Sequence, residues 1–363
     1  MIYEVLTAIV LLLGMFSIQK YKFDYKKTFV VLSGIAFAFF MAFRSYKVGT
    51  DSARYIMAFE HSSKFSFSYL IEIFSKKEAL YHLFQSLVRT FTDNYTVFFT
   101  IIAAFFLISL CRFVYKYSSN PTISFIAYLS MAYYAFNLAG IRQTIAIGFL
   151  LYAMDAMLEK KTLKAVILVG FASLFHISSL IGVFIIIVYY LPLNLFYMLA
   201  CTAASIFMYF SGNTFWKKIV EIVWADERGY KEEFGGTSTL YLLIIIAIGI
   251  AFIAPIIFTN RFKVNKLSAE EQNYVFTNVF FYKLLLFSIP FQVLAIYQAN
   301  AFRVAMIFHI VILVLLPNAV SALKSYTDRF FVNLFLISAL LVQLFVFTYG
   351  VADINPYTFF WQV

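Results

Sequence analysis

The chain has 363 residues, of which 63% are hydrophobic, 21% aromatic and only 13% charged, and its mean hydropathy is +0.85. About a quarter of the residues in soluble globular domains are charged, so this composition excludes an ordinary soluble protein and predicts an integral membrane protein. The net charge of +10 does not point to nucleic acid as a partner. In a membrane protein, lysines and arginines between spans set the orientation and contact anionic lipid.

The first apolar run covers residues 3–17 and precedes the basic segment QKYKFDYKK, with no small-residue cleavage site between them. We therefore interpret it as a first span and not as a signal peptide. A span needs about 20 apolar residues. Further runs that fit are residues 29–43, 96–115, 123–138, 144–158, 193–210, 240–258, 279–296, 304–323 and 332–349.

Residues 163–191 are apolar except for Lys164 and the sequence FHISS in their middle, and they are long for one span but short for two. The basic connectors KYKFDYKK, CRFVYKY, EKKTLK, NRFKVNK and LKSYTDR should all face the cytoplasm. They share one side only if residues 163–191 cross twice and turn near His176. The sequence thus predicts an all-α polytopic protein with about twelve crossings and both termini outside. Residues 1–363 form a single membrane domain in this prediction, without internal repeats.

Two long polar segments, residues 44–95 and 212–239, should then lie on the extracytoplasmic side. The first contains FSYLIEIF and EALYHLFQSLV, in which apolar residues recur at helical spacing. The second ends in a glycine-rich stretch. Both patterns predict amphipathic helices at the membrane surface.

Arg142, in the apolar sequence FNLAGIRQTIAIGFLLY, is unexpected because an arginine at the bilayer centre costs about 2.5–3.5 kcal/mol or more. On the predicted topology it lies at the outer end of a span. The same outer level holds Arg44, Asp51, His176 and Arg303. Polar groups at membrane depth usually face a cavity, so these residues define a candidate site.

Arginine suits phosphate because its planar fork donates two parallel hydrogen bonds to a pair of anionic oxygens. We expect Arg142, with Gln143 beside it, to bind a pyrophosphate or an incoming sugar. Arg44 and Arg303 either join this site or extend their side chains to the lipid headgroups. His176 is either a catalytic base for a sugar hydroxyl or a turn histidine bonded to the serines that follow it.

No motif for a nucleotide or a tightly bound metal is present, whether DxD, HExxH, CxxC or a phosphate-binding loop, so no cofactor and no metal site are expected. The two cysteines lie in apolar runs without metal-ligand spacing and should be reduced and structural. The other ionisable residues fit a structural interpretation: Asp155 and Lys283 near cytoplasmic ends, His309 in mid-span, and Glu72 and Glu78 on a solvated face.

Four blocks in order resemble the EpsG family of Wzy-type polymerases, which act on exopolysaccharide, capsule and O-antigen repeat units. They are FRSYKVGTDSARY, NLAGIRQTIAIG, GFASLFHISSLI and NAFRVAMIF, and the closing NPYTFF at residues 355–360 is also similar. The order and approximate spacing match over most of the chain. One departure is the serine after GTD, where threonine is common.

The resemblance implies a glycosyltransferase of the bacterial cytoplasmic membrane whose active site faces outward. Because no metal motif is present and pyrophosphate is already a good leaving group, we expect this enzyme to be metal-independent. A growing glycan on undecaprenyl pyrophosphate would pass to the next lipid-linked unit, and undecaprenyl pyrophosphate would leave. Other expected partners are membrane lipid, a chain-length regulator and a flippase. Arg44, Asp51, Arg142, Gln143, His176 and Arg303 fall on the family's motif positions. We expect Arg44, Arg142, Gln143 and Arg303 to bind substrate. The acceptor hydroxyl needs a base, for which His176 or Asp51 could serve, and the resemblance does not decide between them.

Three other classes of function fit parts of the pattern. A ligase-like transferase would share the donor but use a different acceptor. A flippase or transporter of lipid-linked sugars would spread its polar groups through the membrane depth, whereas here they gather at one face. A structural or assembly protein would not need this concentration of arginine.

Overall fold

The computed structural model describes residues 2–16, 24–224, 246–247, 249–255, 257–258 and 268–363. Within these residues the regular structure is helical, apart from one isolated bridge between Arg44 and Phe359. Contacts divide the chain into two compact units. The first comprises Met1–Val183 and Leu323–Val363, and the second comprises Phe184–Ala322. The predicted all-α polytopic membrane architecture is confirmed.

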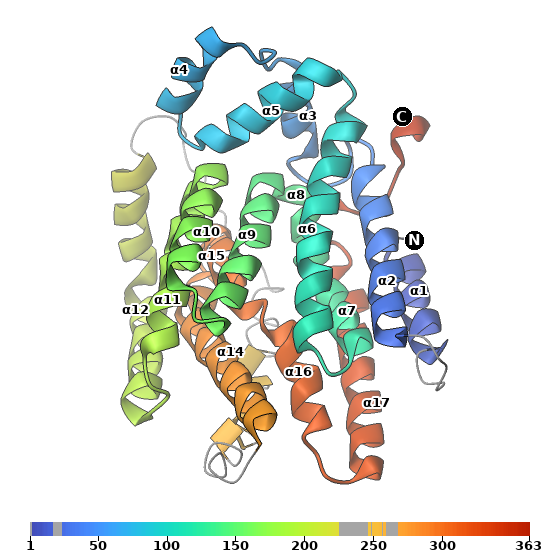
Figure 1. Cartoon of the computed structure of the whole chain (residues 1–363), viewed down its shortest axis with the longest axis vertical. Helices are drawn as coiled ribbons and strands as arrows, with labels where there is room; N and C mark the ends of the chain where they lie inside the picture. The colour runs from blue at the N-terminus through green and yellow to red at the C-terminus, as the bar shows by residue number, and fades with distance from the viewer. Residues whose placement is uncertain (1, 17–23, 225–245, 248, 256, 259–267) are drawn as a thin grey trace. The chain divides into compact units, whose positions relative to one another are not determined.

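The first unit carries the membrane helices of the N-terminal half and those that end the chain (Figure 1). Its helices are α1 (Ile2–Phe16), α2 (Tyr25–Ala42), α3 (Ser52–Glu60), α4 (Phe67–Ser75), α5 (Ala79–Phe91), α6 (Tyr95–Tyr117), α7 (Pro121–Ser130), α8 (Tyr133–Ala139), α9 (Ile141–Leu158), α10 (Thr162–Phe175), η1 (Ile177–Gly182), α17 (Tyr326–Val342), η3 (Gln343–Thr348), η4 (Val351–Asp353) and η5 (Phe360–Gln362). Helix α6 packs between α2 and α9, and α10 packs on α9.

The second unit is built around a long helix that packs on helices before and after it in the sequence. Its helices, as far as the structure describes them by name, are α11 (Val183–Tyr190), α12 (Leu195–Trp224), α14 (Ala269–Leu294), α15 (Ala299–His309) and α16 (Ile312–Ser321). Helix α14 contacts α12, α15 and α16. It starts with a capping box in which Ser268 and Glu271 satisfy each other's backbone N–H groups.

The predicted count of about twelve crossings is not supported. In the described residues, seven helices are long and apolar enough to cross a membrane, or eight if the bent pair α7 and α8 counts as one span. Three further apolar helices, Ile2–Met15, Thr162–Phe175 and Ile177–Tyr190, have 10–17 residues. At 1.5 Å per residue they are shorter than the hydrocarbon core of about 30 Å. The run predicted at residues 240–258 lies partly outside the described residues.

The run at residues 123–138 was predicted as one span, but the chain bends by 57° between α7 and α8. Ala132, which precedes α8, has left-handed backbone angles of φ 61° and ψ 8°. A left-handed residue cannot continue a right-handed helix, so α7 ends here. The break does not depend on glycine or proline, and hydrophobicity does not reveal it.

Helices α3, α4 and α5 form the predicted amphipathic segment within residues 44–95 and cover one end of the first unit (Figure 1). Ser66 caps α4 by accepting a hydrogen bond from the Tyr69 amide. Helix α5 buries Tyr81, Gln85 and Val88, which recur at the spacing of one helical face, and it packs on α3 and α10. The second polar segment, residues 212–239, begins inside α12, which runs on as one helix to Trp224. Residues 225–239 lie outside the described part of the chain.

Candidate functional site

The site in the first unit is organised by Glu78, which the sequence had assigned to a solvated face. Glu78 directly precedes α5 and has left-handed backbone angles, φ 60° and ψ 44°. Such angles are rare for a residue other than glycine and require compensating contacts. Its side chain is only 8% exposed. The compact turn from α4 into α5 therefore directs a carboxylate into the protein.

Three groups from two other segments converge on this carboxylate. Oε2 accepts a hydrogen bond from Nη1 of Arg142 at 2.5 Å. Oε1 lies 2.8 Å from Nδ1 of His176 and accepts a hydrogen bond from the backbone N–H of Ile177 at 3.1 Å. The structure thus joins Arg142 and His176, which the sequence predicted to share a site, through a residue that the sequence did not select.

Arg142 is the second residue of α9, which begins after Gly140 ends α8. A cation is disfavoured at a helix N-terminus because the helix dipole is positive there, and the charge of Glu78 offsets this cost. The guanidinium carbon lies 5.4 Å from the ring centroid of Tyr55 and 5.2 Å from that of Tyr81, within the range of cation–π attraction. Nε and Nη2 of Arg142 donate to no residue in the described part of the chain. They remain able to bind an anionic oxygen pair.

His176 follows the end of α10 and has an extended backbone, with φ −151° and ψ 113°, before the chain enters η1. Its side chain is 20% exposed. Nε2 makes no hydrogen bond to any described residue. One ring nitrogen is therefore held by Glu78 and the other is open to a ligand.

The electrostatics of the cluster keep Glu78 ionised. Burial alone would raise the pKa of its carboxyl, but the hydrogen bond and charge of His176, followed by those of Arg142, outweigh burial and lower the pKa to about 2. At neutral pH this carboxylate is a hydrogen-bond acceptor and a negative charge. It is a poor proton acceptor.

The structure places the other predicted site residues in different surroundings. Gln143 is buried next to Arg142 on α9, and Asp51 precedes α3 and forms an ion pair of 3.5 Å with Arg54. Arg303 lies on α15 in the second unit. Binding and catalytic roles for these residues stay predictions.

Arg44 is a buried connector in the first unit, only 1% exposed. Its guanidinium donates to the carbonyl oxygens of Met41 and Leu138, and its Nε donates to Ser52 Oγ at 3.3 Å. It also lies 3.9 Å from the ring centroid of Phe99. Burial lowers the pKa of Arg44 to about 10, so the group stays charged at neutral pH. These contacts join the end of α2, the end of α8 and the start of α3.

The C-terminal segment holds the loop that follows Arg44. The Ser45 amide donates to the Thr358 carbonyl at 2.9 Å, and the Phe360 amide donates to the Phe43 carbonyl at 3.0 Å. Gly49, with φ +92°, donates to the Asp353 carbonyl, and a Cβ there would lie 3.0 Å from a backbone oxygen of α8. Two sequence blocks far apart in the chain, residues 43–55 and 355–360, are thus in direct contact.

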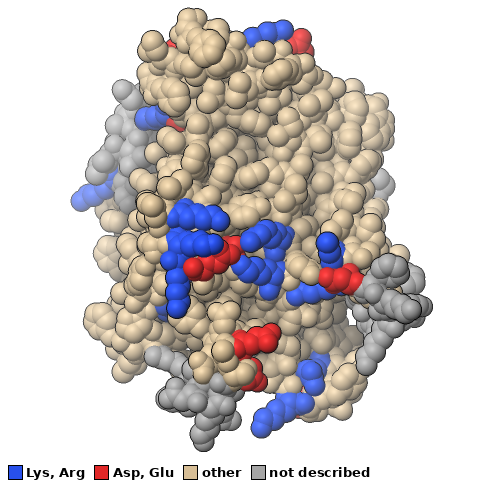
Figure 2. Space-filling view, in the orientation of Figure 1, with Lys and Arg blue, Asp and Glu red and all other residues tan. Residues whose placement is uncertain are grey.

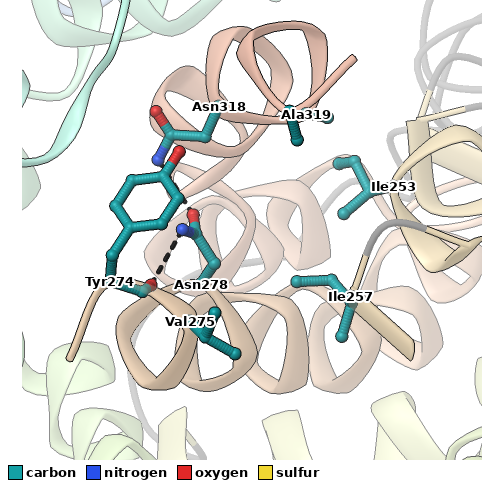
Figure 3. A pocket seen from close by; sticks show the side chains of 8 residues that line it. Ile253, Ile257, Tyr274, Val275, Asn278, Asn318 and Ala319 are labelled. Atoms are coloured by element: carbon teal, nitrogen blue, oxygen red, sulfur yellow. Dashed lines mark hydrogen bonds between the residues drawn. The ribbon is translucent and has the colours of Figure 1, made fainter. Parts of the chain in front are cut away.

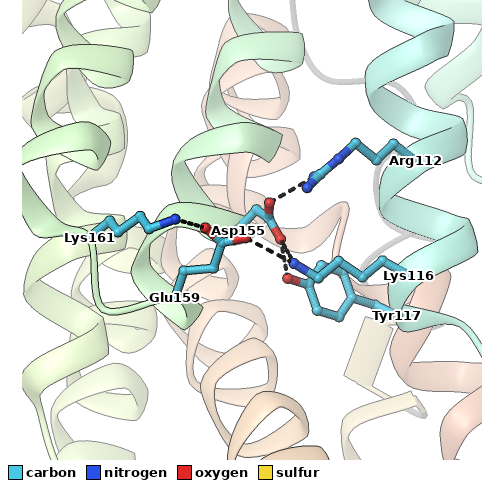
Figure 4. A network of polar contacts seen from close by, with 6 residues as sticks. All are labelled: Arg112, Lys116, Tyr117, Asp155, Glu159 and Lys161. Carbon is cyan, nitrogen blue, oxygen red and sulfur yellow. Dashed lines mark hydrogen bonds and ion pairs between the residues drawn. The ribbon is translucent and has the colours of Figure 1, made fainter.

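A second charged cluster lies at the other end of α9 (Figure 4). The Asp155 carboxylate, 4% exposed, accepts hydrogen bonds from Arg112 at 2.7 Å, from Lys116 at 2.5 Å and from the Tyr117 hydroxyl. Glu159 pairs with Lys116 and Lys161. These contacts fit the structural interpretation of Asp155. Arg142 and Asp155 are thirteen residues apart on one helix, so the two clusters are about 20 Å apart along it.

The surface seen in Figure 2 carries its lysine, arginine and acidic side chains in mixed groups, while most of the surface is neither basic nor acidic. No group of three or more histidine, cysteine, aspartate or glutamate side chains with metal-binding geometry occurs in the described residues.

A small cavity in the second unit is lined by Tyr274, Asn278 and Asn318 with several aliphatic side chains (Figure 3). Asn318 donates to Asn278 Oδ1 at 2.8 Å, and Asn278 donates to the Tyr274 carbonyl at 2.9 Å. Its volume of about 20 Å³ suits one water molecule and is far too small for a sugar. It does not compete with the Glu78 cluster as a substrate site.

Glu78, Tyr55 and Tyr81 are the members of the cluster that sequence reasoning missed. Glu78 precedes an amphipathic helix, and an acidic residue there is most often exposed. Its inward direction depends on the left-handed backbone, which no local pattern indicates. The two tyrosines were indistinguishable from the many aromatic residues of the chain.

The fold and the cluster define an all-helical, polytopic membrane protein that holds an arginine and a histidine on one buried carboxylate. The chain belongs to the EpsG family, whose family model matches residues 27–359, nearly the whole chain, and which is a family of Wzy-like polysaccharide polymerases. Searches of curated proteins and of solved structures find no match.

Proposed function

We propose that this protein polymerises undecaprenyl-pyrophosphate-linked oligosaccharide repeat units at the outer leaflet of the bacterial cytoplasmic membrane. Membership of the EpsG family supports a polysaccharide polymerase in general. The observation that carries the finer proposal is the convergence of Arg142 and His176 on Glu78. It combines an anion-binding fork and a proton acceptor in one cluster.

The position of the cluster supports an outward-facing reaction. Helix α10 begins beside Lys161, in the cluster of Asp155 and Glu159, and ends at His176. The basic residues at the end of α6 and in the turn after α9 therefore lie at one end of the first unit, and the Glu78 cluster lies at the other. Basic connectors face the cytoplasm, which leaves the Glu78 cluster on the outer side.

In the proposed reaction, the hydroxyl of an acceptor sugar binds at Nε2 of His176 and gives its proton to that nitrogen. The hydroxyl oxygen forms a bond to the anomeric carbon of the donor glycan. The bond from that carbon to the pyrophosphate oxygen breaks, and its electron pair leaves with undecaprenyl pyrophosphate. Arg142 stabilises the negative charge that develops on the leaving group. His176 then releases its proton to water.

Pyrophosphate is already a good leaving group, so this scheme uses no nucleotide. We also expect it to use no divalent ion, because arginine supplies the positive charge. Addition of a chelator to the assay below tests this part of the proposal. Abolition of product by the chelator and its restoration by a divalent ion would contradict it.

The test is incubation of the purified protein with a defined lipid-linked repeat unit and no nucleotide sugar, followed by gel analysis. The proposal predicts a ladder of products that differ by one repeat unit. A single product on a different acceptor would indicate a ligase-like transferase instead. Movement of the lipid-linked unit across a liposome membrane without any product would indicate a flippase or transporter.

A further inference from the structure

We infer that Glu78 is a positioning residue that fixes the His176 ring with Nδ1 protonated and Nε2 free to accept the proton of the acceptor hydroxyl. The inference rests on the proposed function for its role in the reaction. The geometry of the two side chains carries it independently.

The contact with Glu78 determines which nitrogen of the neutral His176 ring carries the proton. An ionised carboxylate has only acceptor atoms, so a neutral imidazole 2.8 Å from Glu78 Oε1 must donate through Nδ1. The hydrogen is then absent from Nε2, because a neutral imidazole carries one N–H. Glu78 thereby selects one of the two tautomers of His176.

Glu78 also fixes the orientation of the His176 ring. Oε1 of Glu78 binds both the His176 ring and the amide of the next residue, Ile177. The same oxygen therefore fixes the side chain and the backbone of the turn. Oε2 is held by Arg142, so the ring and the guanidinium have fixed positions relative to one carboxylate. A leaving group on Arg142 and a hydroxyl on His176 would be aligned by this arrangement.

Glu78 does not take the proton that the acceptor hydroxyl transfers to His176. Both oxygens of Glu78 are occupied by donors, and the lowered pKa of this carboxyl disfavours its protonation. The proton that arrives at Nε2 stays on the ring, which becomes an imidazolium ion paired with the carboxylate. Glu78 stabilises this cation without taking the proton, as the buried acid does in hydrolase triads.

Other ionisable groups of neighbouring elements also set the charge near His176. Helix α9 contributes the cation of Arg142, and α3 and α5 contribute the phenol rings of Tyr55 and Tyr81, which lie next to that cation. His82 on α5 has its pKa lowered by burial and then by Lys76 and Arg142, so it is neutral at neutral pH. Glu78 is the negative charge in contact with the His176 ring in the described residues.

The direct test is ¹⁵N NMR of the histidine side chains in the full-length protein in lipid. The chain has only four histidines, and a His176→Asn variant identifies the signal of interest. The inference predicts that the neutral ring of His176 carries hydrogen on Nδ1 and not on Nε2, and that Glu78→Gln weakens this preference. A neutral wild-type His176 ring with hydrogen on Nε2 overturns the inference. This measurement does not depend on polymerisation, so it separates failure of the inference from failure of the proposed function.

The kinetic test compares the rate of ladder formation by the wild type, Glu78→Gln and Glu78→Asp at matched abundance of folded protein. Glu78→Gln should reduce the maximal rate on the order of a hundredfold. Glu78→Asp keeps a carboxylate and should keep more of the rate than Glu78→Gln.

Glu72→Gln is the matched control, because Glu72 lies in the same amphipathic segment and forms an exposed ion pair with Lys76. It should have the wild-type rate. An unchanged rate for Glu78→Gln would overturn the positioning role. A lower rate for Glu78→Gln with the wild-type tautomer preference in the ¹⁵N spectrum would also overturn it and would indicate a purely structural residue.

Discussion

Arg44 and Arg142 are both set into apolar surroundings, but their guanidinium groups have different partners. Arg142 pairs with one carboxylate and keeps N–H groups that donate to no described residue. Arg44 donates to backbone oxygens from two helices and to a serine hydroxyl. The sequence identified both as exceptional without distinguishing between them, because the difference lies in contacts between segments far apart in the chain.

Arg44→Lys should lower the stability of the protein by about 2 kcal/mol, since lysine cannot reach all of these acceptors and leaves buried carbonyl oxygens without a donor. Thermal unfolding in detergent, followed by size-exclusion chromatography, measures the loss. Arg54→Lys is the control, because the Arg54 side chain is 74% exposed and pairs only at the surface. A stable but inactive Arg44→Lys variant would instead favour the predicted role in substrate binding.

At the scale of the elements, hydrophobic runs predicted the long spans but not their interruptions. The predictions at residues 29–43, 96–115 and 144–158 correspond to α2, α6 and α9. The break between α7 and α8 and the contact between residues 43–50 and the C-terminal segment were not predictable. Both depend on backbone conformation or on pairing across more than 300 residues, and neither leaves a periodic signal.

Removal of residues 357–363 should loosen the loop that follows Arg44. The Ser45 amide loses its acceptor, Thr358, and the 2.6 Å contact between the two side-chain hydroxyls is also lost. Hydrogen exchange in a peptide covering residues 43–52 should become faster by about tenfold or more, because opening costs less free energy. A peptide covering α4 provides the control. Equal exchange at residues 43–52 in both forms would show that the C-terminal segment does not hold the loop.

At the scale of the whole molecule, α9 and α10 connect two charged clusters of different composition. One contains Arg142, His176 and Glu78, and the other contains Asp155 and basic residues at the end of α6. The distribution of basic connectors predicted this separation. The number of crossings could not be predicted from hydrophobicity, because several apolar runs in the described residues form helices that are too short to cross a membrane.

Cysteines introduced at Lys77 and at Lys161 should react with a membrane-impermeant thiol reagent from opposite sides. Both positions are exposed, and they lie beside the Glu78 cluster and the Asp155 cluster, respectively. The native Cys111 and Cys201 are replaced by alanine first. Lys77 should be labelled in intact cells, and Lys161 only after the membrane is opened. Labelling of both from one side would contradict an outward-facing Glu78 cluster.

The central claim is that the Glu78 cluster performs polymerisation. The test compares two single variants, each with one arginine replaced by lysine, at opposite ends of the first unit. Arg142→Lys keeps the charge but loses the planar fork, so ladder formation at matched abundance should fall about a hundredfold, which corresponds to ~3 kcal/mol. Arg112→Lys, in the Asp155 cluster, should form ladders at nearly the wild-type rate, because lysine can still pair with that carboxylate. Near-normal ladders from Arg142→Lys, or equal losses in both variants, would contradict the assignment of the reaction to this cluster.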